Sequence, residues 1–128
     1  MFTTANQFVF YGIDNMSQKL DSIIKSLDVE NGHFEIKLIM TEAITNAFIH
    51  GNNNDKSKPI IMMCKKDKNY LNISVRDCGT NKKKLKLDKH VDEDSILEES
   101  GRGLFIISAY TDEVKVEDNC IVMKKSLI

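Results

Sequence analysis

The sequence predicts a two-layer α/β (α+β) sandwich, in which one mixed, mostly antiparallel sheet carries its helices on a single face. The expected elements run β-α-α-β-β, then a long polar segment, then α-β-β. Paired strands with helices between them favour such a sandwich. Strict β-α-β alternation is missing, which argues against a doubly wound parallel sheet. The 128 residues fit one domain spanning 1–128.

The first half of the chain predicts one strand and two helices. A β-rich run at 7–11 ends at Gly12, and apolar residues at the spacing of one helix face follow between 14 and 28, with Asp14 as the expected N-cap. The next helix, at about 33–50, is apolar around most of its circumference. A helix of that kind is buried, so each of its few polar residues needs a reason to be there.

The second half predicts two hairpins and one helix. The expected strand pairs are 59–65 with 70–77, and about 113–118 with 120–126. Between the hairpins, residues 79–100 are rich in Lys, Asp and Glu and lack apolar periodicity. A polar segment of about twenty residues inside a compact domain tends to be functional or mobile; the alternative is a solvated linker. The helix is expected to open at Gly101-Arg102-Gly103.

Composition and charge exclude several classes of protein. The hydrophobic fraction of 41% and the charged fraction of 29% are ordinary for a globular domain. A net charge of −1 gives no bulk attraction to nucleic acid or to an anionic membrane. The sequence shows neither an apolar run long enough to span a membrane nor a signal peptide, so we expect a cytoplasmic protein. The three cysteines and three histidines make no metal-ligand pattern, and we expect reduced thiols.

One polar cluster lies on the apolar second helix. Glu42, Asn46 and His50 follow one another at i, i+4 and i+8, which places them on one face. A carboxylate or an amide costs about 2 kcal/mol or more when it is buried without a partner. A core polar network, a metal or a ligand would each satisfy this cluster. Asn46 can offer Mg²⁺ a carbonyl oxygen, and Glu42 can orient or deprotonate a hydroxyl group.

Two more clusters lie where loops meet regular elements. Asp77-Cys78-Gly79 follows an alternating strand, where the acid can accept a hydrogen bond from an exocyclic amine and the glycine allows close approach; a plain turn is the alternative. Gly101-Arg102-Gly103 precedes an apolar helix. The backbone N–H groups of a helix start suit phosphate, and Arg102 suits a phosphate or an acidic patch on a partner. An ordinary loop-to-helix transition explains this cluster equally well.

The order of the three clusters resembles the Bergerat ATP-binding fold, which is shared by gyrase B, the mismatch-repair protein MutL and the sensor histidine kinases. The resemblance covers residues 8–126. Within this superfamily, the run from Thr41 to Gly51 looks most like the anti-sigma-factor serine kinases of bacteria. The run from Gly101 to Ile107, followed by Thr111-Asp112-Glu113-Val114, looks like the same branch.

This resemblance implies a protein serine kinase that uses ATP and Mg²⁺. Asn46 would be the Mg²⁺ ligand and Glu42 the general base that acts on a serine of an anti-anti-sigma protein. Asp77 would bind the adenine amine and Gly79 would lie against the base. Gly101 and Gly103 would cap the triphosphate beneath a lid at about 80–100. The nucleotide-binding set implied by the resemblance is completed by His50, Thr80, Arg102 and Leu104.

The resemblance also implies partners. The domain would hold a sigma factor inactive, usually as a homodimer, and release it by partner exchange; no nucleic acid or membrane contact is implied. The sequence departs from the family pattern at one place, because Asp77-Cys78-Gly79-Thr80-Asn81 lacks the second glycine that often follows. A different class of function is therefore the alternative: a non-catalytic module that sequesters its partner, with ATP structural or absent.

Overall fold

The computed structural model describes residues 5–79 and 99–128 and contains one five-stranded sheet. Its strands are β1 (Ala5–Phe10), β2 (Ile60–Lys66), β3 (Tyr70–Arg76), β4 (Glu113–Glu117) and β5 (Cys120–Ser126). They lie in the order β1-β2-β3-β5-β4, and all four pairings are antiparallel. The predicted two-layer fold and both predicted hairpins are confirmed.

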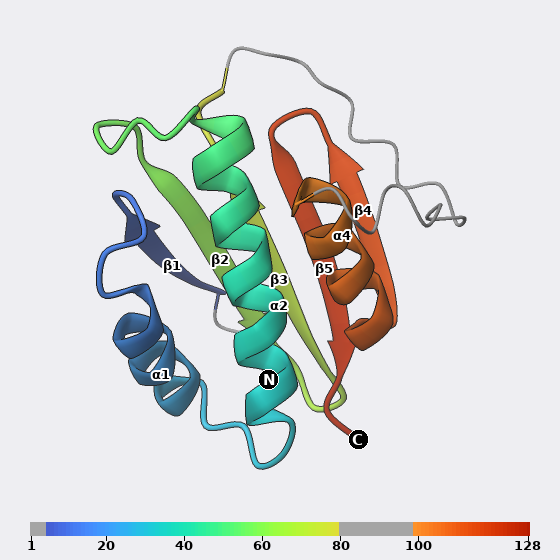
Figure 1. The fold of residues 1–128 in the computed structure, drawn as a ribbon. Helices are drawn as coiled ribbons and strands as arrows, with labels where there is room; N and C mark the ends of the chain where they lie inside the picture. The colour runs from blue at the N-terminus through green and yellow to red at the C-terminus, as the bar shows by residue number, and fades with distance from the viewer. Residues whose placement is uncertain (1–4, 80–98) are drawn as a thin grey trace.

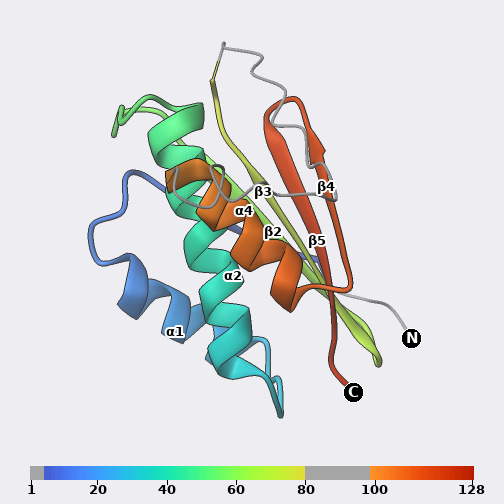
Figure 2. The same ribbon diagram turned by 45° about the vertical axis from the view of Figure 1, so that its right-hand side comes forward.

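The helices all cover the same face of this sheet (Figures 1 and 2). They are α1 (Met16–Ser26), α2 (His33–Asn46), which continues into the π-helical turn η1 (Ala47–Gly51), and α4 (Glu99–Tyr110). In both views α2 lies between α1 and α4, and it packs against both. This central position explains why α2 is apolar on nearly every side.

The core fills the space between the two layers. Alternate residues of β3 point into it, because side chains of a strand alternate between its two faces. From α2 the core receives Ile36, Ile39, Met40, Ala43 and Ile44, each with no exposed surface. Burial of this apolar area, at about 25 cal/mol per Å², is the main force that holds helices and sheet together.

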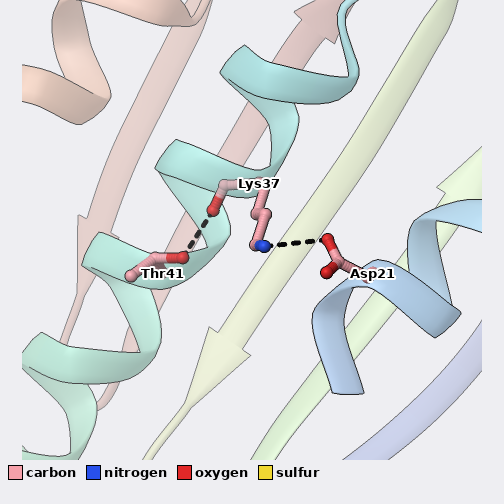
Figure 3. A network of polar contacts seen from close by, with 3 residues as sticks. All are labelled: Asp21, Lys37 and Thr41. Carbon is pink, nitrogen blue, oxygen red and sulfur yellow. Dashed lines mark hydrogen bonds and ion pairs between the residues drawn. The ribbon is translucent and has the colours of Figure 1, made fainter. Parts of the chain in front are cut away.

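The polar contacts of α2 add little to the stability that this apolar burial provides. Lys37 of α2 pairs with Asp21 of α1 at 2.8 Å, and the Thr41 hydroxyl group donates to the carbonyl oxygen of Lys37 at 2.7 Å, as Figure 3 shows. Both side chains of the ion pair are partly exposed. A pair of this kind contributes about 1 kcal/mol or less to stability. It therefore helps to orient α1 on α2 but adds little to the strength of their contact.

The structure moves three predicted boundaries. The first helix begins at Met16, after Asn15 in the left-handed conformation with φ 58°, and the predicted cap Asp14 instead pairs with Lys56 at 2.9 Å. The second helix changes to π-helical hydrogen bonding over its last turn. The last helix begins at Glu99, so Gly101 is its third residue rather than its start. No helix in the described part of the chain is long and apolar enough to cross a membrane.

We predict that Ile39→Ala lowers the free energy of unfolding by about 2–5 kcal/mol, because it opens a cavity between α2 and the sheet. Phe34→Ala, on the same helix, is the matched control: Phe34 is 73% exposed, so the change should stay within about 0.5 kcal/mol. Urea unfolding of the two variants measures the difference. Equal losses would contradict the position of α2 at the centre of the core.

Candidate functional site

A cavity of about 300 Å³ lies where the C-terminal end of α2 meets β3 and the β4–β5 hairpin. Asn46, His50 and Asp77 line it, so the structure brings the first two predicted clusters together. The sequence did not predict several other residues that line the cavity, namely Gly51, Asn53, Asp118, Asn119 and Cys120. The hairpin residues among them carried only a turn signal, and only the sheet order places that turn beside Asp77.

Asn46 is a buried polar residue of α2 that lacks a hydrogen-bond partner among the described residues. Its side chain is 7% exposed, and its Nδ2 atom has no hydrogen-bond partner among the described residues. A buried amide without a partner loses about 1–3 kcal/mol of solvation. The described structure therefore does not satisfy Asn46 by a core network, the alternative that the sequence had left open, and the amide is available to a ligand.

The third predicted cluster meets the first through Gly103 of α4. A methyl group added to Gly103 would lie 3.1 Å from Oε2 of Glu42 and 3.3 Å from Nδ2 of Asn46. Because Gly103 has no side chain, the first turns of α4 can approach both polar groups of α2. The N–H groups of a first helical turn have no intrahelical acceptor, and they carry the positive end of the helix dipole. This end of α4 can therefore hold an anion beside Asn46.

The segment Asp77-Cys78-Gly79 is held by hydrogen bonds at each of its three N–H groups. The N–H of Asp77 donates to the carbonyl oxygen of Asn119 at 2.9 Å. The N–H of Cys78 donates to the side-chain oxygen of Asn52 at 2.8 Å, and the N–H of Gly79 donates to Oδ1 of Asp77 at 2.8 Å. Oδ1 of Asp77 is thus engaged, and Oδ2 is left to accept from a ligand.

Burial raises the pKa of Asp77 above its ordinary value, although the bond from Gly79 and the charge of Arg76 oppose this shift. Desolvation disfavours the charged form of a carboxyl group. A further hydrogen-bond donor at this carboxylate would stabilise its charged form. A ligand that presents an amine or an amide N–H to Oδ2 is therefore the complementary partner.

Two glycines allow the walls of the cavity to meet. A methyl group on Gly51 would lie 2.1 Å from Oδ2 of Asp77, and one on Gly79 would lie 2.2 Å from the carbonyl oxygen of Gly51. Both distances are far below any allowed contact, so larger residues would push β3 away from the end of α2. Gly79 was a predicted site residue. Gly51 was read only as a helix stop, because its need for space comes from a strand more than twenty residues away.

The remaining predicted site residues lie in different surroundings. His50 is exposed at the cavity, and Arg102 is exposed on α4 outside the cavity lining. Leu104 is 7% exposed and belongs to the hydrophobic core. Gly101 lies in the first turn of α4. Thr80 and nearly all of the predicted lid at 80–100 lie outside the described residues.

The charges of the cavity lining are negative. Asp77 and Asp118 contribute carboxylates, and no Lys or Arg lines the cavity in the parts of the chain that are described. Those parts also contain no group of three or more His, Cys, Asp or Glu side chains that would hold a metal alone. A cation that arrives with an anionic ligand would offset the negative charge of the described lining.

Comparisons with known proteins agree with this geometry. The model of the family described as the histidine kinase-like ATPase domain matches residues 17–125. The anti-sigma F factor of Geobacillus thermodenitrificans is 34% identical over 91 residues, which cover 65% of this chain and 58% of the relative. The anti-sigma F factor of Oceanobacillus iheyensis is 32% identical over 84 residues, with 64% and 58% covered.

A third relative is covered more fully. The anti-sigma F factor of Clostridium perfringens is 30% identical over 100 residues, which cover 73% of this chain and 71% of the relative. The match spans 58% of the length of the two relatives described before it. The chain therefore belongs to the histidine kinase-like ATPase domain family, and the resemblance to anti-sigma factors that its motifs indicated is confirmed.

Proposed function

We propose that this chain is an ATP-dependent serine-protein kinase of the anti-sigma-factor type. It phosphorylates a serine of an anti-anti-sigma-like partner, sequesters a sigma factor or an analogous regulator, or does both. One observation carries the proposal: the buried amide of Asn46, whose Nδ2 has no partner among the described residues, lies beside Glu42 and against Gly103 of α4. This supports the proposal because Oε2 of Glu42 and Nδ2 of Asn46 each lie within about 3.3 Å of the position that a Cβ on Gly103 would take, so a metal ligand and a base could act together beside the start of α4.

The residues present fit ATP with Mg²⁺. An amide can be turned about its last bond to exchange its nitrogen and oxygen, so Asn46 can present the carbonyl oxygen that Mg²⁺ prefers. Mg²⁺ usually takes one or two protein oxygens together with substrate phosphates and waters, which suits a site with one such residue. The ion would supply positive charge beside Asp77 and Asp118 of the described lining.

The other end of the cavity fits the adenine base. Oδ2 of Asp77 would accept from the exocyclic amine, and Gly51 and Gly79 allow Asp77 to keep its position because neither has a side chain that would displace it. The volume of about 300 Å³ lies at the lower end of the range for small-molecule sites. With the base at Asp77, Asn46 and the start of α4 would be the residues that hold the triphosphate.

The residues at the phosphate end account for transfer. Phosphoryl transfer depends mainly on positioning and on stabilisation of charge. Glu42 accepts the proton of the serine hydroxyl as the bond from the serine oxygen to the γ-phosphorus forms and ADP leaves. The first turn of α4, around Gly101, holds the phosphate oxygens, and Arg102 meets a phosphate or the partner.

The partners are proposed from the family and from the names of the relatives, which are anti-sigma F factors. A sigma factor as partner implies action in the cytoplasm. The homodimer, the single domain at 1–128 and the lid at about 80–100 remain predictions of the resemblance. A module that sequesters its partner without phosphorylating it is the alternative, and the variants below separate the two.

We predict that Asn46→Ala weakens Mg²⁺-dependent ATP binding by about a hundredfold or more, since even indirect metal partners are worth about 10–100-fold. Titration calorimetry with ATP and Mg²⁺ measures it. Thr41→Ala is the matched control, because the hydroxyl group of Thr41 bonds only within its own helix, and its affinity should equal that of the wild type. Equal ATP affinity in Asn46→Ala would contradict the assigned role.

We predict that Asp77→Asn weakens ATP binding by about tenfold or more, because the amide would present a donor to the donor of adenine. Burial raises the pKa of Asp77, so the folded state holds this proton more tightly than the unfolded chain and the charged form costs stability at pH 7. The variant should therefore unfold at the same temperature or higher. For the same reason, ATP affinity of the wild type should fall as the pH drops through this raised pKa. A variant that is both less stable and unchanged in affinity would refute this role.

We predict that Glu42→Gln keeps ATP affinity within about twofold and lowers transfer to the partner serine by about 10²–10⁴-fold, the usual contribution of a general base. Transfer of radiolabelled phosphate to an anti-anti-sigma homologue from the same genome measures it. A serine-to-alanine variant of that homologue is the control for the acceptor. Undiminished transfer in Glu42→Gln excludes Glu42 as the base. Sigma-factor binding by a wild type that transfers no phosphate would favour the sequestering module.

A further inference from the structure

We propose that Asn52 is a positioning residue that sets the adenine-recognising end of the cavity, apart from the phosphate end. Asn52 does not line the cavity. It follows Gly51 in the chain, and it holds the residue that follows Asp77. The inference rests on the proposed ATP site and deepens it by assigning base recognition to a residue that touches no nucleotide.

Asn52 is the most completely buried polar residue among those described. It has no exposed surface, whereas Asn46 is 7% exposed. Its Nδ2 donates to the carbonyl oxygens of Lys58 at 3.1 Å and Pro59 at 3.3 Å, and its Oδ1 accepts from the N–H of Cys78 at 2.8 Å. A side-chain amide has two N–H donors and one acceptor oxygen, so these contacts use every group that Asn52 has.

These contacts join three segments that are distant in sequence. The backbone N–H of Asn52 closes the π-helical turn by donating to the carbonyl oxygen of Ala47 at 2.8 Å. The side chain then ties this turn to the residues before β2 and to the end of β3. Other residues cannot replace it there: Asp has no donor at neutral pH, and Ala leaves a buried N–H and two carbonyl oxygens without partners. A fully satisfied buried network of this kind fixes one arrangement of the backbone.

The effect on Asp77 follows from chain connectivity. Gly51 and Asp77 are in contact across the cavity wall, and their chain neighbours Asn52 and Cys78 share a hydrogen bond. Loss of that bond lets the two segments separate, and Oδ2 of Asp77 then leaves its position. The phosphate end depends on different contacts, because Gly103 reaches Asn46 and Glu42 through the packing of α4 on α2.

The test compares a ligand that has a base with one that lacks it. Mg·ATP and Mg·tripolyphosphate each displace a fluorescent ATP analogue from the wild type, from Asn52→Ala and from Asn52→Asp. We expect both variants to lose about tenfold or more in affinity for ATP, since small misplacements of positioning groups have large effects, and to keep their affinity for tripolyphosphate within about twofold. In Asn52→Asp the shape is kept, but a carboxylate faces two carbonyl oxygens. This variant decides the question if Asn52→Ala does not fold.

Ile39→Val is the control for a general loss of stability, because Ile39 is fully buried in α2 and lies away from the cavity; it should bind both ligands as the wild type does. Amide hydrogen exchange at Cys78 should be faster in Asn52→Ala, which removes the oxygen that accepts from this N–H. Equal losses for the two ligands, or wild-type affinity for ATP in the variants, overturn the inference alone. A wild type that does not bind ATP overturns the proposed function and this inference together.

Discussion

Burial of α2 between α1, α4 and the sheet is the constraint on which the rest of the structure depends. The helix buries Ile36, Ile39, Met40, Ala43, Ile44 and Asn46, and the need to cover these residues places the two outer helices. The C-terminal half of this helix also carries Glu42 and Asn46. Burial of a polar group without a hydrogen bond costs free energy. For Asn46 part of this cost remains, because its Nδ2 has no partner in the described structure.

Glycine residues shape the site as much as its functional side chains do. Gly51 and Gly79 let the end of α2 touch the end of β3, and Gly103 lets α4 touch α2. At each contact the backbone lies close to a carboxylate or an amide, and a Cβ atom on the glycine would prevent this approach. Asn52 and Asn119 then fix the backbone of the acid segment from two sides. The cavity is therefore shaped by backbone, and the functional side chains are few.

The two ends of the cavity differ in what stabilises them. The end at Asp77 is held by hydrogen bonds to backbone N–H groups, which are directional and depend on particular partners. The end at Asn46 is held by the packing of α4 on α2, which depends on close contact and not on particular hydrogen bonds. A ligand that has an amine at one end and negative charge at the other fits both, since Oδ2 of Asp77 needs a donor and the first turn of α4 needs an anion.

The sequence by itself determined the elements of the fold and three of the cavity residues. Apolar periodicity is a local property, so α2, both hairpins and the buried face of β3 were readable, and the spacing of Glu42, Asn46 and His50 followed from helix geometry. Asp77 was visible as an acid at a strand end. The tertiary structure alone decided that the β4–β5 turn adjoins β3, that Gly51 must be a glycine, and that Asn52 is a buried link rather than a turn residue. These facts depend on contacts between residues 26 to 42 positions apart, and no local pattern records which segments meet.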